Sequence, residues 1–401
     1  MARFKYSGRD RSGTRTGTLS ASSKREAIIK LKEENIRVVD ITEVQETALT
    51  KDISIGNPVK LQHFVIYLRQ FSTLLRAGVS VVESTRILAD QTESKPLRKA
   101  LLDVEQDLRE GNPFSSAVSR HKKIFTPLFI NMMRAGEASG TIDETLERLA
   151  EHFEKQHQTR QKIISAMAYP IILLFIAIGV VIFLLVSVVP TFVEMFADFG
   201  GELPAITQFV LHASTFMQGF WWVIVLLAIL FAGSIMLIRQ NKETKYYLDY
   251  FLLRVPIFGK MLQKAALARM TRTLSSLFTS SVPILQAMGI VENVVENEVI
   301  ARVIRQSRDS LEKGQSLTVP MKNHWAFPPL ISHMIAIGEE TGSLDAMLGK
   351  VADFYEREVE NSTERLKSLI EPLMIVLLAG LVGTIVTSIM IPMFDIFNQV
   401  Q

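Results

Sequence analysis

The 401-residue chain contains no cysteine. It therefore has no disulfide framework, and neither a thiolate nucleophile nor a thiolate metal site can be built from it. The sequence also lacks a Gly-Lys-Ser/Thr phosphate loop and a glycine-rich dinucleotide loop, so it predicts no nucleotide hydrolysis. The first residues, MARFKYSGRDRSG, carry charge but no apolar core, which argues against a signal peptide and favours a cytoplasmic N-terminus.

Clusters of catalytic or metal-binding side chains are missing as well. The seven histidines are scattered, and His152 and His157 lie five positions apart, a spacing that does not place both on one helix face. We expect them to be solvated or interfacial. The formal net charge of +3 is too small to predict nucleic-acid binding. The sequence thus predicts no enzymatic activity and no cofactor.

Charge is absent from three long stretches of the chain. Residues 163–193, 203–238 and 372–394 carry no Asp, Glu, Lys or Arg. A helix of about 20 apolar residues crosses a bilayer core of about 30 Å. We therefore predict transmembrane helices at 163–193, 221–238 and 372–394, with Trp221 and Trp222 in an interfacial belt and 194–220 as a short extracytoplasmic loop.

The distribution of basic residues predicts the orientation of these spans. Lys and Arg are absent from residues 191–220 and from the stretch after Pro392. They are frequent on the other side, at Lys155, Arg160, Lys162, Arg239, Lys242, Lys245, Arg365 and Lys367. By the positive-inside rule, the N-terminus is expected in the cytoplasm and the short C-terminus outside, in a multi-pass protein of the cytoplasmic membrane.

The remaining sequence predicts soluble, mainly helical parts. Residues 1–55 combine short β-prone runs with the helical stretch KREAIIKLKEENI, which indicates a small α+β unit. Amphipathic helical patterns fill 59–161 and 264–368. The predicted fold is mainly α, with two homologous cytoplasmic helical bundles, three transmembrane helices and the small N-terminal α+β unit.

The two helical blocks are copies of one unit. The segment MMRAGEASGTIDETLERLAEHFE aligns with MIAIGEETGSLDAMLGKVADFYE, and each block ends in an apolar run with a proline near its start and another near its end. Such a repeat indicates a duplicated supersecondary unit, here a bundle that continues into a transmembrane helix. The aligned pairs are Gly136 with Gly338, Glu137 with Glu339, Gly140 with Gly342, Asp143 with Asp345, Pro170 with Pro372, and Pro190 with Pro392.

The acidic residues of this motif have two interpretations. In the structural one, Gly140 and Gly342 end a helix in the left-handed conformation, and Thr141 and Glu144 form a capping box on the next helix. In the functional one, the acids form a contact or a carboxylate cation site on the cytoplasmic face, which requires several acids to converge. The structural interpretation is favoured.

Glu371 is a further candidate because it lies beside Pro372, where the third span begins. An acid at this depth either pairs with a neighbour or lies in the membrane interface. The small residues Gly179, Gly380 and Gly383 suit close helix packing and suggest self-association as a hypothesis.

The duplicated G-E-x-[ST]-G-x-[IL]-D element, with K-I-x-x-A-M-x-Y-P followed by V-V-P, resembles the type II secretion F family. That family includes inner-membrane platform proteins of type II secretion, type IV pili and competence pseudopili, and the resemblance covers nearly the whole chain. The second copy departs from the first, with Glu371-Pro372 in place of Tyr169-Pro170 and Ser281 in place of Gly78. The first copy is the more typical one.

The resemblance implies a function without catalysis. A hexameric assembly or secretion ATPase is expected to dock on exposed charges of the bundles and of the basic N-terminal unit. Pilin or pseudopilin subunits and other inner-membrane assembly proteins are the further expected partners, and a homo-oligomer is expected. The alternative, a membrane component of a transporter or channel, is disfavoured because the spans carry no charge and most of the chain is soluble helix.

Overall fold

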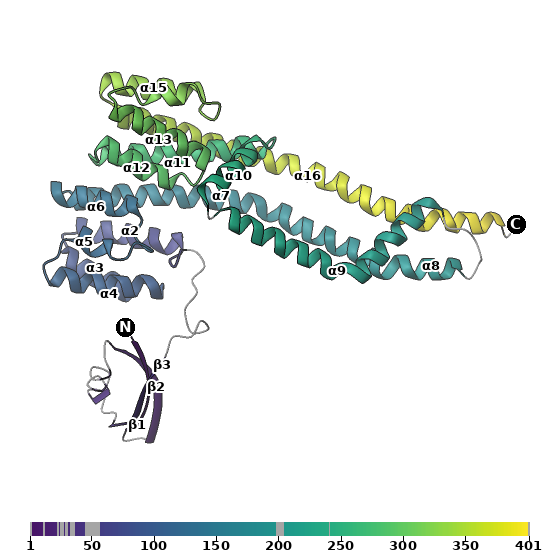
Figure 1. Ribbon diagram of the computed structural model, residues 1–401, viewed down its shortest axis with the longest axis horizontal. Coiled ribbons are helices and arrows are strands. Elements are labelled where there is room, and N and C mark those ends of the chain that lie inside the picture. The colour runs from purple at the N-terminus through teal and green to yellow at the C-terminus, as the bar shows by residue number, and fades with distance from the viewer. Residues whose placement is uncertain are drawn as a thin grey trace. The chain divides into compact units, whose positions relative to one another are not determined.

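The computed structural model describes residues 2–10, 13–21, 24, 28, 31–32, 37–44, 57–197, 204–239 and 241–399 (Figure 1). The chain divides into two compact units, Met1–Pro58 and Val59–Gln401. Each unit has its own buried residues and is considered by itself.

The first unit is built on a three-stranded antiparallel sheet. Its strands are β1 (Ala2–Asp10), β2 (Gly13–Ala21) and β3 (Arg37–Val44), in the order β2-β1-β3. Between β2 and β3 the described residues 24, 28 and 31–32 are helical, and the rest of the predicted helix lies outside the described residues. Leu31 and Ile41 are buried, which supports the predicted α+β character.

The second unit opens with the first repeat, in which the apolar face of each helix turns toward a shared core. Five phenylalanines lie in this core, and their rings meet mostly edge to face at centroid distances of 5.1 to 6.2 Å. The phenylalanines are Phe64, Phe71, Phe114, Phe125 and Phe129. The helices are α2 (Leu61–Arg76), α3 (Val81–Gln91), α4 (Lys95–Arg109), α5 (Phe114–Ser119), α6 (Pro127–Ser139) and α7 (Ile142–Phe183).

The second repeat follows the first helix for helix. One hydrophobic cluster contains buried residues of both repeats, so the two bundles share a core. At the position of Gly78, Ser281 takes a positive φ of 58°, a conformation that side chains with a Cβ adopt at a cost. The helices are α11 (Phe258–Thr279), α12 (Ile284–Val294), α13 (Glu298–Glu312), α14 (Thr318–Lys322), α15 (Pro329–Thr341) and α16 (Leu344–Gln399).

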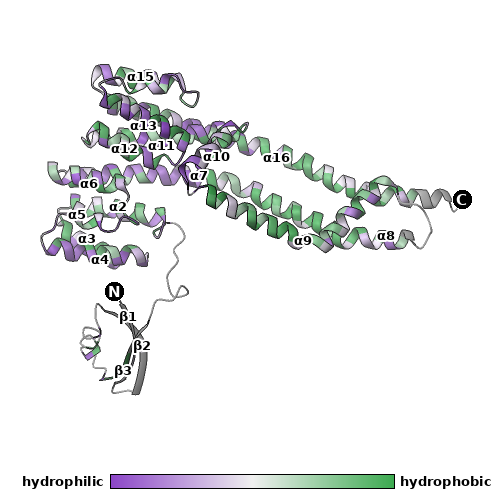
Figure 2. Ribbon diagram, in the orientation of Figure 1, coloured by the Kyte–Doolittle hydropathy of each residue, from purple (hydrophilic) through white to green (hydrophobic). Residues whose placement is uncertain are grey.

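Three helices are long and apolar enough to cross a membrane, which confirms the predicted fold class. They are α7 with its continuation, α9 (Ala205–Ile238) and α16. Figure 2 shows the hydrophobic colour concentrated along these helices beyond the bundles. Past Phe183 the first span continues as a π-helix, η1 (Leu184–Val188), and then as α8 (Val189–Ala197).

The region predicted as a loop, 194–220, is helical over most of its described length. Helix α8 extends to Ala197, and α9 begins at Ala205. The polar Ser, Thr, Gln and His residues of 205–220 weaken the hydrophobic signal, but they do not prevent a helix. The backbone of Phe220 is not helical (φ −121°, ψ 18°), so α9 bends directly before the predicted start of the span.

A further helix, α10 (Lys242–Arg254), lies between α9 and α11, where the sequence predicted no element. Its first residue follows the end of α9 within four positions. Helix α10 contacts both α11 and α13, so it is part of the second bundle.

Candidate functional site

The two motif glutamates fasten a short helix in each repeat. The Glu137 carboxylate accepts hydrogen bonds from the backbone N–H groups of Phe114 and Ser115, at the start of α5. The Glu339 carboxylate accepts a 2.8 Å hydrogen bond from the N–H of Leu317, before α14. These carboxylates satisfy N–H groups that a helix start leaves free. The geometry accounts for a glutamate at this position in both copies.

Gly140 and Gly342 end α6 and α15 with positive φ angles of 73° and 69°. This is the left-handed conformation that the sequence predicted. The predicted capping box is wrong, because the Thr141 hydroxyl makes a 2.7 Å hydrogen bond with the hydroxyl of Ser139 and does not cap α7. Thr141 has φ −111° and ψ 44°, which is not the extended geometry of a capping residue.

The first glycine of each motif allows two helices to approach closely. A Cβ atom on Gly136 would lie 2.5 Å from Oγ1 of Thr145 on α7, and one on Gly338 would lie 3.0 Å from Cα of Leu344 on α16. Carbon and oxygen atoms do not pack at these distances. The glycines therefore bring α6 against α7 and α15 against α16.

The motif aspartates are not brought together. Asp143 is exposed in the first turn of α7, and Asp345 is half-buried in the first turn of α16. Acids in a first turn interact favourably with the helix dipole. Among the residues that the structure describes, no group of three or more His, Asp or Glu side chains is placed to hold a metal ion.

An arginine–glutamate pair repeats in both bundles, and sequence reasoning missed it. Arg69 on α2 donates two hydrogen bonds to Glu154 on α7. At the matching positions, Arg272 on α11 donates two hydrogen bonds of 2.7 Å to Glu356 on α16. Each pair fixes the first helix of a repeat to its long helix. The sequence did offer a signal, because an arginine and a glutamate occur at matching positions in both aligned repeats.

In the second repeat, Glu356 and its neighbour Asp353 also interact with the first repeat. Lys155 on α7 lies 3.4 Å from Asp353 and 4.0 Å from Glu356 on α16. Arg272 donates to Asp353 as well. Burial would raise the pKa of Asp353, but the hydrogen bond and charge of Arg272 and the charge of Lys155 outweigh it and hold that pKa below its usual value. Asp353 and Glu356 on α16 therefore connect that helix to both α7 and α11.

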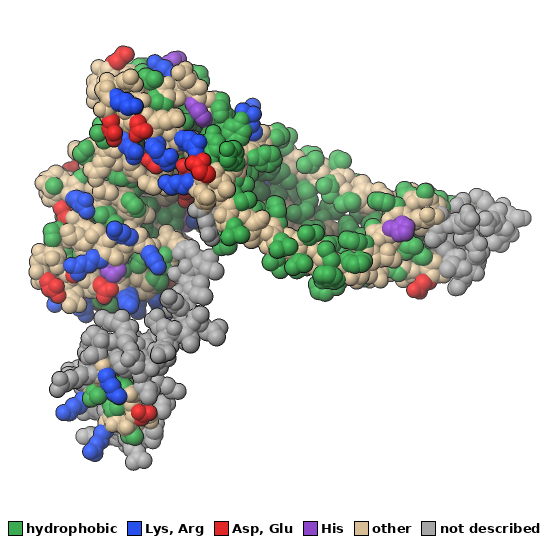
Figure 3. All heavy atoms as spheres, viewed as in Figure 1, with side chains coloured by type: hydrophobic (Ala, Val, Ile, Leu, Met, Phe, Trp, Pro, Cys, Tyr) green, Lys and Arg blue, Asp and Glu red, His purple; other side chains and the backbone are tan. Residues whose placement is uncertain are grey.

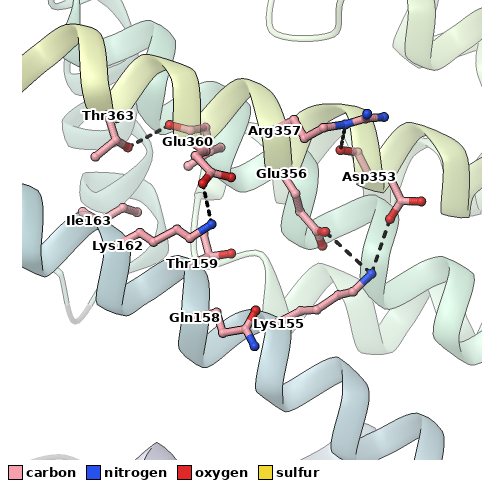
Figure 4. A pocket seen from close by; sticks show the side chains of 11 residues that line it. Lys155, Gln158, Thr159, Lys162, Ile163, Asp353, Glu356, Arg357, Glu360 and Thr363 are labelled. Atoms are coloured by element: carbon pink, nitrogen blue, oxygen red, sulfur yellow. Dashed lines mark hydrogen bonds and ion pairs between the residues drawn. The ribbon is translucent and has the colours of Figure 1, made fainter.

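A cavity of about 400 Å³ lies between α7 and α16 at this junction. Figure 4 shows that Lys155 and Lys162 extend from α7 toward acidic side chains on α16. Lys162 Nζ lies 2.5 Å from a carboxylate oxygen of Glu360, about two turns closer to the membrane than Asp353. The two repeats are therefore linked by ion pairs directly before their helices become apolar.

His152 is buried at the same junction, which corrects the expectation of a solvated or interfacial side chain. Only 5% of it is exposed, and its Nδ1 lies 3.2 Å from the Ser276 hydroxyl on α11. Burial lowers its pKa to about 4, and the charges of Arg272 and Arg269 act in the same direction. Helix α7 packs against α11 and α16 of the second bundle. The second bundle therefore covers the face of α7 that carries His152, which the first bundle alone would leave exposed to water.

At the far end of the membrane helices, α9 compensates for both closing prolines. In the π-helix η1 each backbone N–H bonds the carbonyl five residues earlier, as the N–H of Val189 bonds the Leu184 carbonyl. The next donor, to the Leu185 carbonyl, would be residue 190, but Pro190 has no N–H. Ser214 on α9 donates a 2.5 Å hydrogen bond to the Leu185 carbonyl instead. The ladder is thereby completed from a neighbouring helix.

The second copy has the same arrangement. Pro392 removes the N–H that would bond the Ser388 carbonyl four residues earlier, and Thr207 on α9 donates a 2.6 Å hydrogen bond to that carbonyl. Apolar side chains of the first, second and third spans surround the two hydrogen bonds. Helix α9 therefore holds the ends of both repeats together.

No described side chain from a neighbouring helix is seen to compensate in this way for Pro170 or Pro372, the prolines near the start of the spans. Pro170 is buried within α7 and Tyr169 is half exposed. Glu371 and Pro372 are exposed on α16. Within the part of the chain that the structure describes, no hydrogen bond or ion pair of the Glu371 side chain is seen, so the interfacial alternative fits it better.

Two homologous helical bundles, each continuous with a membrane helix and linked at both ends of that helix, define a duplicated multi-pass membrane protein. Residues 67–190 and 270–392 match the family described as type II secretion system (T2SS), protein F, and residues 1–42 match the N-terminal domain of that protein. The chain belongs to the type II secretion system protein F family, which confirms the resemblance found in its motifs.

Similar proteins occur in both pilus assembly and secretion. The type IV pilus assembly protein PilC of Thermus thermophilus is 38% identical over 405 residues, covering 100% of both chains. PilC of Myxococcus xanthus is 33% identical over 100% of this chain and 96% of its own length. The type II secretion system protein F of Vibrio cholerae is 32% identical over 99% of each chain. The three apolar helices and the membership in this pilus and secretion family together indicate an inner-membrane protein.

Proposed function

We propose that this protein is the membrane platform of a type IV pilus or type II secretion machine. In this proposal a cytoplasmic hexameric ATPase docks on the bundles, and its movements reach pilin or pseudopilin subunits in the membrane. The names of the similar proteins support the setting. The basic residues at the bundle ends of the spans support a cytoplasmic location for the bundles and an extracytoplasmic C-terminus.

The observation that carries the proposal is the continuity of the two long helices. Helix α7 runs from the motif of the first repeat to Phe183, and α16 runs from the motif of the second repeat to Gln399, each as one helix. Both helices continue without interruption through the proline at the start of their span, Pro170 in α7 and Pro372 in α16, although a proline is a place where a helix can bend. In this proposal a displacement of either bundle moves the membrane end of its helix.

The links at both ends favour joint movement of the two repeats. Near the bundles, Lys155 and Lys162 tie α7 to α16. At the far end, Ser214 and Thr207 tie both helices to α9. Force applied to one bundle is in this way shared by three membrane helices, as a platform requires.

Deletion of the gene in its host tests this function. We expect loss of surface fibres, of protein secretion or of DNA uptake, with pilin-like subunits still made and retained in the membrane. Which of the three is lost identifies the machine. Survival of all three, together with a defect in solute uptake, would contradict the platform function and favour a transporter component.

The partners are tested with the full-length protein in detergent. Co-purification of the assembly ATPase encoded by the same host is expected. Charge reversal of exposed residues on the bundles should weaken it, whereas matched reversals on the extracytoplasmic side should not. An ATPase that binds equally well after every bundle substitution would contradict docking on the bundles. A homo-oligomer stays a prediction of the family resemblance.

A further inference from the structure

Helix α10 presents an apolar face that no part of the described chain covers. Tyr247 and Phe251 are 70% and 68% exposed, one turn apart on the same face. Exposed apolar residues continue through the turn into α11, at Ile257, Phe258 and Leu262. We call these five residues the α10 patch. Figure 3 shows hydrophobic side chains gathered where the second bundle meets the membrane helices.

The opposite face of α10 is fastened to the second bundle, so the helix cannot turn to bury the patch. Asp249 accepts a 2.7 Å hydrogen bond from the N–H of Glu298 at the start of α13. The guanidinium of Arg302 lies 4.2 Å from the ring centre of Tyr246. On the next turn the ring of Tyr250 meets that of Trp325 edge to face at 5.6 Å. The exposure of the patch is therefore a stable property of the fold.

Two attachments place the patch at the depth where the spans leave the membrane. Helix α9 ends at Ile238, directly before α10. On the other side of the patch, the Thr363 hydroxyl on α16 lies 3.9 Å from the sulfur of Met261. Thr363 is six positions before the exposed Leu369, or roughly 9 Å along a helix at about 1.5 Å per residue.

The charges around the patch complement an anionic surface. Residues 239–264 contain six basic and two acidic side chains. Both acids are occupied, Glu243 by Arg302 and Asp249 by the N–H of residue 298. The exposed cations are Arg239, Lys242, Arg254 and Lys260. A helix with aromatic residues on one face and lysines beside them is suited to the headgroup region of a bilayer.

We propose that α10 lies in the membrane interface, with the α10 patch inserted among anionic phospholipids. The helix then supports the second bundle against the membrane surface, at a point the spans alone do not fix. Among the described residues no membrane helix precedes α2, so the described part of the first repeat has no equivalent of α10. This inference rests on the membrane helices and is independent of the proposed function.

Because the chain has no cysteine, single-cysteine variants of the full-length protein can carry a spin label at one chosen site. The protein is reconstituted in liposomes of phosphatidylethanolamine and phosphatidylglycerol. Collisions of the label with oxygen, which concentrates in lipid, are compared with collisions with a water-soluble nickel chelate. The test variants are F251C and F258C. The control is L330C on α15, because Leu330 and Phe258 are both 39% exposed.

We expect the labels at positions 251 and 258 to collide preferentially with oxygen and the label at 330 with nickel. Replacing phosphatidylglycerol by phosphatidylcholine, or combining K242Q and K260Q, should shift the label at 251 toward water. Preferential collision with nickel at 251 and 258 in anionic liposomes would overturn the proposal. So would a label shielded from both reagents, because that result shows a protein surface, from a second copy or a partner, on the patch. No response to lipid charge or to the lysine substitutions would overturn the assignment to anionic lipids.

Discussion

Arg272 and Glu356 form a two-hydrogen-bond ion pair whose side chains are only 16% and 21% exposed, and the same acid lies within reach of Lys155 from the other repeat. Loss of the arginine would leave a carboxylate partly buried without its main partner. The substitution R272M should lower the free energy of unfolding by about 2 kcal/mol in detergent.

Removing Lys162 provides the matched comparison. Its pair with Glu360 is about half exposed on both sides, so K162M should cost less than about 1 kcal/mol. Denaturant titration of both variants measures the difference. Equal effects would show that the Arg272 pair does not hold α11 to α16.

The approach of α6 to α7 depends on the missing side chain at Gly136. The substitution G136A places a Cβ 2.5 Å from the Thr145 hydroxyl and should cost about 2 kcal/mol of stability. The double variant G136A/T145A removes the clashing atom and should recover part of that loss. In G179A the new Cβ meets no atom within 4 Å, so this control should be stable. The idea fails if G136A unfolds at the same temperature as the wild type.

The pairing of Ser214 with the Leu185 carbonyl can be tested by restoring the missing backbone donor. S214A should cost about 1 kcal/mol, because the carbonyl is left unpaired within the membrane. P190A supplies an N–H at that position, so S214A should cost less in a P190A background. T215V is the control, because Thr215 bonds only within α9 and is exposed. Additive effects in the thermal unfolding of the four variants would contradict the compensation.

His152 should make stability depend on pH. Its pKa is about 4 in the fold and 6.5 in an unfolded chain, so the unfolded state alone binds a proton between these values. The stability contributed by neutral burial is complete above pH 6.5 and decreases as the pH falls toward 4, by up to about 3 kcal/mol. Arg269 and Arg272 on α11 face the same ring and keep their charge throughout.

H152Q should flatten this dependence, whereas H157Q on the same helix should not. Thermal unfolding at several pH values between 7 and 5 measures the effect. A wild-type protein that loses no more stability than H152Q over this range would show that the histidine is not buried in neutral form.

Much of the fold could be predicted because the sequence repeats. The alignment of Gly140 with Gly342 located the same helix end twice, and long uncharged runs located the spans. Where hydropathy is mixed, as in 205–220, the signal for a span is weak although the residues are helical. Helix α10 was missed because its two apolar faces, one on the bundle and one exposed, hide the helical period.

The site could be predicted only in part. Motif comparison found Glu137 and Glu339, but their partners are backbone N–H groups more than 20 positions away, which no local pattern reveals. The burial of His152 and the ion pairs of Lys155 arise from packing between the repeats. Such contacts depend on tertiary arrangement, and periodicity within one helix carries no information about them.

The central claim is that movement passes from the bundles to the membrane through continuous helices. The most direct test inserts four glycines between Gln161 and Lys162 in α7, where both residues are exposed. The same insertion between Thr92 and Glu93, in the turn after α3, is the control. We predict that the α7 insertion abolishes fibre assembly or secretion while the protein still accumulates and still binds the ATPase, and that the control insertion leaves assembly intact. Normal assembly with the interrupted α7 would contradict the account.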